Sequence, residues 1–490
     1  MINPSYIPII GLMVAVAVLI FLVLRTKVHP LIAMLGAACI AGITGGMSVD
    51  STIDAITKGF GSTLGSIGIV IGLGVMMGRI LEVSGAAEQI AFSFIRWLGR
   101  KREEWALTWT GYIVSIPIFA DSAFVLLYPI GKALALKGNR SILTLGVSLA
   151  GGLIITHTLV PPTPGPLGAA GIYGVDIGAM MVFGMLMAIP CVIGIVKYAQ
   201  WLDKKFPEGP DVDPSENSKM KLLDTFSDQQ LTKSSPGLMV SLIPILVPIL
   251  LIFIKALVRI VPGVSENTHS FVSTILAIIN FLGAPIIALS VSTLLAVYLL
   301  VPYLDRSATA KRLEEGLQSA GIILLVTGAG GALGAVVRDS GAGALLADKI
   351  ISLPLSPIMI PFIISTLIRL IQGSATVSCI TTASICAPIL SRIPDVNMLF
   401  AAQATASGAF FFSYFNDSFF WVANRMMGIT DVKKQVVVWS VAICVPWGIA
   451  GTLIALLNLL FGTGGTLLDP LLPACILTVI LLYVMRKSRR

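Results

Sequence analysis

Long apolar runs, separated by short polar segments, recur along the whole chain. A helix that spans a membrane needs about 20 mainly apolar residues. Runs of this kind lie near residues 5–24, 28–47, 60–81, 141–160, 178–199, 237–258, 271–302, 317–337, 436–458 and 470–485. A further crossing near 397–431 is interrupted in its middle. The pattern predicts an all-α polytopic membrane protein.

Four shorter apolar stretches do not fit simple spans, and they form two pairs. The first pair is 105–119 and 123–136, joined by Asp121-Ser122, and the second is 357–371 and 376–391, joined by Gly373-Ser374. Each half is too short to cross a bilayer comfortably. Irregular backbone at membrane depth is tolerated only where protein or a water-filled cavity surrounds it. We therefore predict two re-entrant hairpins.

Composition supports the membrane class and narrows the chemistry. Of 490 residues, 56% are hydrophobic and only 12% are charged, whereas soluble domains carry about 25% charged residues. The net charge of +8 does not indicate a nucleic-acid partner, because the cations lie between apolar runs rather than on one face. The six cysteines form no CxxC pair, and no Walker motif or metal-ligand cluster occurs. We expect no cofactor and no metal.

The Lys and Arg residues predict an orientation, because cytoplasmic segments of membrane proteins are enriched in them. If both hairpins return to the side that they entered from, most of the basic residues fall on one side, including the cluster Arg96–Arg102 and the tail Arg486–Arg490. This arrangement places the N-terminus outside and the C-terminus in the cytoplasm.

An internal repeat is visible in the glycines and in the break points. Gly72, Gly74, Gly78, Ser84 and Gly85 match, at one constant spacing, Gly328, Gly330, Gly334, Ser340 and Gly341. The first copy is expected to start outside and the second in the cytoplasm, so the two repeats are inverted. Inverted repeats are common in secondary transporters, where substrate binds near the midplane at broken helices.

The repeat gives a predicted domain organisation. The first half comprises N-terminal scaffold spans (1–47) and a first repeat (48–200), which contains a hairpin at 105–136 and a broken helix at 141–177. A cytoplasmic linker (201–235) leads to further scaffold spans (236–302). The second repeat (303–458) contains a hairpin at 357–391 and a broken helix at 397–431, and a C-terminal span with a basic tail (459–490) follows.

Ionisable residues at the break points are candidates for function. Burying an unpaired charge is costly, so Asp121, His157 and Asp417 are expected to face a cavity or a partner and to carry protons, ions or substrate. The alternative is a structural hydrogen bond between a hairpin and its neighbour. We predict Asp121, assisted by His157, as the proton carrier. Arg369 either pairs with a substrate carboxylate, forms a salt bridge to a buried Asp, or reaches the membrane interface.

The same break points supply a predicted substrate site. Prolines and glycines free backbone groups there, hydroxyl and amide side chains add ligands, and the N-termini of half-helices offer partial positive charge to an anion. The predicted substrate-binding residues are Ser122, Ala123, Thr158, Pro161, Pro162, Thr163, Gly373, Ser374, Ala375, Thr376, Asn416, Asp417 and Ser418.

Several of these runs resemble the gluconate permease (GntP) family of the ion transporter superfamily. They are 116–127, His157–Pro166, Gly373–Val377, and Asn416–Ser418 with Phe420-Trp421. The resemblance implies a proton-coupled permease of the bacterial cytoplasmic membrane for gluconate, a related sugar acid or hydroxy acid, or, in some members, D-serine. It also implies a homodimer whose transport domain moves as an elevator. Thr163 and Tyr414 stand where His is common in the family, which leaves the solute within the family open.

The sequence leaves three alternatives to proton-coupled transport. Sodium could be the coupling ion, since freed carbonyls with Asn and Ser side chains can also coordinate Na⁺. An intramembrane aspartyl enzyme would need Asp121 and Asp417 close enough to share a proton, but the chain lacks the Gly-x-Gly-Asp context of such enzymes. A channel is conceivable, although two opposed hairpins favour alternating access.

Overall fold

A computed structural model describes most of the chain. It covers residues 7–26, 28–98, 102–138, 140–206, 236–260, 270–303, 306–352, 354–414 and 417–487. Every regular element within these ranges is helical. Seven of the described helices or joined helices are long and apolar enough to cross a membrane, or eight if one bent pair counts as a span. This confirms an all-α integral membrane protein; most of the predicted linker 201–235 lies outside the described residues.

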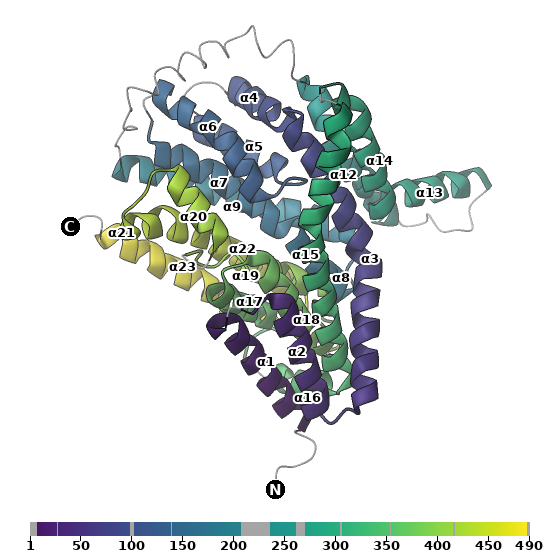
Figure 1. Cartoon of the computed structure of the whole chain (residues 1–490). Helices are drawn as coiled ribbons and strands as arrows, with labels where there is room; N and C mark the ends of the chain where they lie inside the picture. The colour runs from purple at the N-terminus through teal and green to yellow at the C-terminus, as the bar shows by residue number, and fades with distance from the viewer. Residues whose placement is uncertain are drawn as a thin grey trace.

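Two long helices run side by side through the molecule, α3 (Val49–Val83) and α15 (Arg306–Asp339) (Figure 1). Glycines allow their close approach: a Cβ added to Gly59 would lie 2.5 Å from the carbonyl oxygen of Gly331. The repeat-related glycines have similar uses, because Gly74 packs against Pro162 and Gly330 packs against Ser384. α3 thus packs against the break of the first broken helix, and α15 packs against the second helix of the second hairpin. The inverted relation of the two repeats stays a prediction.

The predicted hairpin segments are helix–break–helix units. The first consists of α5 (Glu103–Val114) and α6 (Ala120–Gly138), and the second of α17 (Met359–Gln372) and α18 (Ala375–Leu390). The second break falls at Gly373-Ser374 as predicted. The first was predicted at Asp121-Ser122 and instead spans 115–119, so both residues belong to the first turn of α6. Pro117 explains the shift, since proline has no N–H and disfavours helix in the residue before it.

Both predicted broken helices are interrupted. The first consists of α7 (Ile142–Leu159) and α8 (Pro164–Tyr173), and the second of α19 (Met398–Gly408) and α20 (Ser418–Met426). The predicted span 271–302 is not one straight helix: it consists of α13 (Ser270–Leu282) and α14 (Pro285–Leu300), which are bent by 67° and together are long and apolar enough for one crossing. Pro285 gives the physical reason, because the residue before a proline avoids the helical conformation.

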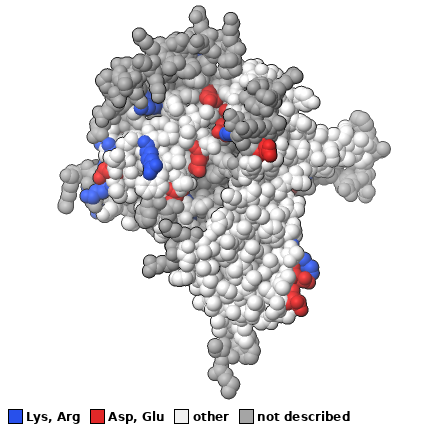
Figure 2. Space-filling view, in the orientation of Figure 1, with Lys and Arg blue, Asp and Glu red and all other residues white. Residues whose placement is uncertain are grey.

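The remaining helices surround these units (Figure 1). They are α1 (Ile7–Arg25), α2 (Pro30–Thr44), α4 (Ala86–Leu98), α9 (Ile177–Lys205), α12 (Leu238–Ile260), α16 (Ala342–Ile351), α21 (Val432–Gln435), α22 (Val441–Phe461) and α23 (Leu468–Lys487). Figure 2 shows a face that is largely free of charge, with charged side chains gathered in its upper part and at one spot on the lower right. Such a surface is typical of a protein in contact with lipid.

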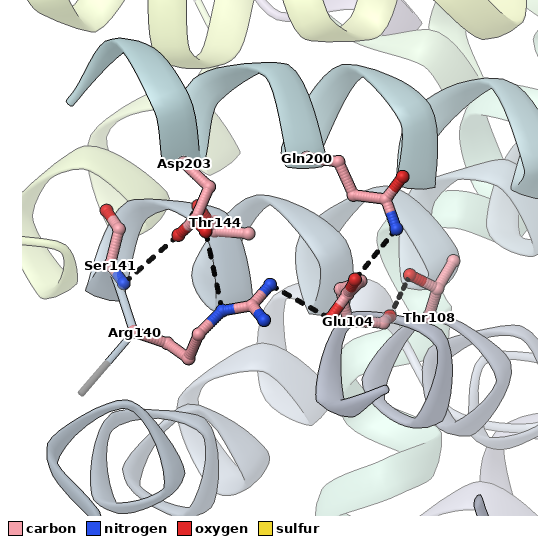
Figure 3. Close-up of polar contacts among 7 residues, drawn as sticks. All are labelled: Glu104, Thr108, Arg140, Ser141, Thr144, Gln200 and Asp203. Atoms are coloured by element: carbon pink, nitrogen blue, oxygen red, sulfur yellow. Dashed lines mark hydrogen bonds and ion pairs between the residues drawn. The ribbon is translucent and has the colours of Figure 1, made fainter. Parts of the chain in front are cut away.

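A buried polar network joins the base of the first hairpin to α7 and α9 (Figure 3). Glu104, of which only 3% is exposed, accepts from Arg140 Nη2 at 3.2 Å and from Gln200 Nε2 at 2.8 Å. Arg140 Nε also lies 3.4 Å from Asp203 Oδ2, and Asp203 Oδ1 accepts from Thr144 Oγ1 at 3.1 Å. The network links helices that are far apart in sequence and makes them one packed unit.

Candidate functional site

The centre of the candidate site is a buried ion pair between the second hairpin and the second broken helix. Arg369 lies in the last turn of α17, and its Nη2 is 2.7 Å from Oδ2 of Asp417, which precedes α20. The two residues are 5% and 9% exposed. Of the alternatives that the sequence left open for Arg369, the structure shows the salt bridge to a buried Asp.

The carboxylate of Asp417 has two further partners besides the arginine. Its Oδ1 accepts from the backbone N–H of Phe419 at 3.0 Å, which caps the N-terminus of α20. The hydroxyl of Ser413 donates to Oδ2, and Trp439 Nε1 donates to Ser413 Oγ at 3.0 Å. Asp417 is therefore both a helix cap and the counter-ion of Arg369, and any change in its charge affects both helices.

Ser413 and Trp439 were not predicted as site residues. Ser413 lies in the polar run that breaks the second helix, so the sequence did carry a signal for it. Trp439 lies in a separate apolar segment, and only the packing of the chain brings it to the ion pair. Asn416, a predicted ligand, lies outside the described residues, and Ser418 is the exposed first residue of α20.

The second hairpin break lies against the first broken helix. Gly373 has a φ of 77°, which lets the chain reverse after α17, and Ser374 Oγ accepts from Val377 N at 3.3 Å to cap α18. A Cβ added to Gly165 of α8 would lie 3.4 Å from Thr376 Cα. The start of α8, with Pro164, and the start of α18, with Ala375, are therefore neighbours, and both bring partial positive charge to this region.

The break between α7 and α8 is held by a glutamine that the sequence reasoning missed. Pro161 and Pro162 lie in the break, where Thr163 Oγ1 donates to Val160 O. Gln403 of α19 is fully buried, and its Nε2 donates to Leu159 O at 3.2 Å and to Met180 O at 3.1 Å. The sequence did carry a signal for this residue, because Gln403 is the one amide side chain in a run of small and apolar residues.

Two predicted residues at the end of α7 have polar atoms without a hydrogen-bond partner among the described residues. They are His157, through Nδ1, and Thr158, through Oγ1. The ring of His157 lies edge-on to that of Phe119 in the first hairpin break, with centroids 5.9 Å apart. Buried polar atoms without a partner are uncommon, and these two mark the break as a polar point in a buried region.

The first hairpin approaches the ion pair from the side of α6. The ring of Phe124 lies 5.5 Å from that of Phe419, two residues after Asp417. Asp121 is exposed, Ser122 is half-buried and Ala123 is buried. Asp121 and His157 each lie within electrostatic range of Asp417. The ionisable residues predicted from the sequence thus interact through Asp417, the partner of Arg369.

This arrangement suits an anion. A guanidinium binds a carboxylate through two parallel hydrogen bonds, and the starts of α8 and α18 favour negative charge beside it. Hydroxyl groups at the hairpin break, from Ser374 and Thr376, could bind hydroxyls of the same solute.

Comparison with known proteins shows the family. The family described as GntP family permease matches residues 7–460. An uncharacterised permease of Haemophilus influenzae is 61% identical over 99% of both chains. A gluconate permease of Pseudomonas aeruginosa is 31% identical over 87% of this chain and 92% of its own. The D-serine transporter DsdX of Escherichia coli K12 is also 31% identical, over 86% of this chain and 91% of its own.

A solved structure shares the fold. The YdaH transporter of Alcanivorax borkumensis superposes with a TM-score of 0.63 over 88% of this chain and 99% of its own, at 14% identity. These relatives are permeases and transporters, which sets aside the intramembrane enzyme. The chain belongs to the GntP family of permeases and is an integral membrane transporter.

Proposed function

We propose that this protein is a secondary transporter that imports gluconate, or a related small sugar acid or hydroxy acid, together with protons. The observation that carries the proposal is the buried pair of Arg369 and Asp417. It lies where a hairpin break and two broken helices meet, which is the usual position of substrate in transporters built from repeats.

The carboxylate of the solute replaces Asp417 as the partner of Arg369. The arginine stays charged at any accessible pH, so its site always needs one anion. A solute carboxylate that takes this place leaves Asp417 without its counter-charge, and a lone buried carboxylate is costly. Uptake of a proton by Asp417 removes this cost.

Proton transfer to this region uses the neighbouring titratable groups. Asp121 is exposed at the start of α6 and is the proposed proton carrier, with His157 assisting. Asp417 is the proton acceptor when the solute is bound. Binding of solute and binding of a proton are then linked, as symport requires.

The hydroxyl groups of the solute are assigned to the break points around the ion pair. Ser374, Thr376 and Thr158 supply hydroxyls, and Ser122 with the backbone of Ala123 closes the site from the first hairpin. The prolines Pro161 and Pro162, with Gly373 and Ala375, leave backbone groups open to the solute.

Transport follows an elevator mechanism in a homodimer of the bacterial cytoplasmic membrane. Both hairpins and both broken helices move together against scaffold helices, with the N-terminus outside and the C-terminus inside. The network around Glu104 supports movement as one body, because it links the base of the first hairpin to α7 and α9.

Two alternatives concern the solute and the ion. A zwitterion such as D-serine would place its carboxylate at Arg369 and its ammonium at Asp121; the name of one relative, a D-serine transporter, favours testing it. Sodium would bind at carbonyls freed in the breaks and would replace the proton.

The test is uptake of labelled gluconate into proteoliposomes under an imposed proton gradient and, separately, a sodium gradient. Unlabelled glycerate, lactate and D-serine compete alongside. Accumulation driven by protons supports the proposal. Accumulation of a competitor but not of gluconate overturns the solute, and accumulation driven by sodium alone overturns the coupling ion.

A further inference from the structure

A cavity of about 390 Å³ lies away from the ion pair, between α3 and α15 on one side and the ends of α8 and α18 on the other. Ser62 and Ser66 of α3 and Ser391 after α18 bring hydroxyls to its wall. Arg338 is the one charged residue among its described lining residues. Its volume falls within the range of roughly 300–1,000 Å³ that is usual for small-molecule sites.

Arg338 lies at the mouth of this cavity, with 55% of its side chain exposed. Its Nε donates to Asp339 Oδ1 at 3.0 Å. A guanidinium carries five N–H donors in a rigid plane, so the pair with Asp339 uses only part of its capacity. A carboxylate can bind to the remaining donors through two parallel hydrogen bonds.

Two neighbouring helices connect the cavity to the candidate site. Along α8 and α18, Gly165 lies beside Thr376, Gly168 lies beside Ile380, and Tyr173 lies beside Cys386. The two helices therefore run alongside each other in the same direction. They begin at the break points and end at the cavity. With about 1.5 Å of rise per residue, the ten residues of α8 place the cavity about 15 Å from the break.

We propose that this cavity is an access site, where the carboxylate of the transported solute pairs with Arg338 before it reaches Arg369. This inference rests on the proposed function. In the proposed orientation the cavity opens to the outside, so it captures the solute for import. Because Asp339 partly neutralises Arg338, the cavity attracts an anion without holding it tightly, which suits a site that must also release it.

The experiment is initial-rate uptake of labelled gluconate by wild-type protein and by Arg338→Gln in proteoliposomes. The expected result is a KM raised about five- to tenfold with an unchanged maximal rate, because only the first encounter loses its charge partner. Asp339→Asn, which removes the competing carboxylate, should lower KM. The matched control is Arg392→Gln, which removes an exposed charge just past Ser391 but outside the cavity lining, and it should leave KM unchanged.

Two further arms separate the possible outcomes. Ser66→Leu fills the cavity from an exposed helix face and should raise KM as Arg338→Gln does. An equal KM for the wild type and both cavity variants overturns the access site while leaving the transporter intact. If the effect of Arg338→Gln appears only in vesicles that contain phosphatidylglycerol and not in pure phosphatidylcholine, the cavity binds a lipid headgroup and the proposal fails. Absence of gluconate uptake by the wild type would overturn the proposed function itself.

Discussion

Arg369 Nη2 and Asp417 Oδ2 are 2.7 Å apart and almost fully buried, and the two residues come from the end of one helix and the start of another. The pair joins a hairpin to a broken helix at the place where both are interrupted. A buried ion pair adds little net stability, but loss of one partner is costly because it leaves the other charge unpaired. Such a pair is suited to exchange of one anion for another.

Removal of one partner should therefore harm the fold more than removal of both. We expect Arg369→Gln and Asp417→Asn each to lower the free energy of unfolding by about 3–5 kcal/mol. The double variant should regain much of that loss but should not transport gluconate, since it lacks the cation for the carboxylate. Thermal unfolding in detergent, with uptake in proteoliposomes, measures both. A double variant that transports at the wild-type rate would contradict the role of Arg369.

The proton carrier can be separated from the solute site. Asp121→Asn should abolish accumulation of gluconate driven by a proton gradient but retain exchange of labelled for unlabelled gluconate, because exchange needs no net proton movement. The matched variant is Asp54→Asn, an exposed Asp outside the site, which should still accumulate gluconate. Proton-driven accumulation by Asp121→Asn would remove the assignment.

Gln403 should be needed for the shape of the first broken helix. Gln403→Met removes a donor from the carbonyl oxygens of Leu159 and Met180, and of these only Leu159, in the last turn of α7, lacks a helical N–H to replace it. Each buried unsatisfied group costs about 1–3 kcal/mol. We expect a lower Tm together with weaker gluconate binding, since the prolines of the break then lose their support. Gln403→Asn is the matched change, with the same amide on a shorter side chain, and should give a similar loss. An unchanged Tm for Gln403→Met would mean that another group satisfies the carbonyl of Leu159.

Loss of the polar network at the base of the first hairpin should lower the stability of the protein. Glu104→Ala leaves the amide of Gln200 without its acceptor and leaves Arg140 with Asp203 as its remaining carboxylate partner, and we expect a loss of about 1–3 kcal/mol. Asp54→Ala breaks an exposed pair with Lys58 at 3.5 Å and should leave the Tm unchanged, because exposed pairs contribute little. Equal effects of the two changes would contradict the importance of burial here.

The crossing of the two long helices depends on the absence of a side chain. Gly59→Ala places a methyl group 2.5 Å from the carbonyl oxygen of Gly331, so the backbones of α3 and α15 must separate and the Tm should fall. Gly61→Ala, on the same helix with nothing within 4 Å of the new Cβ, should be neutral or stabilise by about 0.5–1 kcal/mol. A Tm for Gly59→Ala that matches the Gly61→Ala value would show that the helices tolerate a wider spacing.

The sequence alone determined the class of protein, most of the helices and the places where helices break. These features are local. Apolar runs of about 20 residues need lipid, and proline and glycine interrupt helices wherever they stand, as at Pro161-Pro162 and Gly373. The family was also visible in short runs around these breaks. One local signal was misread, since Pro117 and not Asp121 marks the first hairpin break.

Only the tertiary structure decided how the break points are combined. Arg369 and Asp417 are 48 positions apart, and Gln403 reaches a carbonyl 244 positions away. No spacing rule links such residues, because their contact depends on how separate helices pack. The same is true of the cavity beside Arg338, whose wall comes from α3, α8, α15 and α18. Charge pairing over such separations depends on the folded chain. The helix breaks that make it possible depend on local residues, because proline and glycine interrupt a helix where they occur.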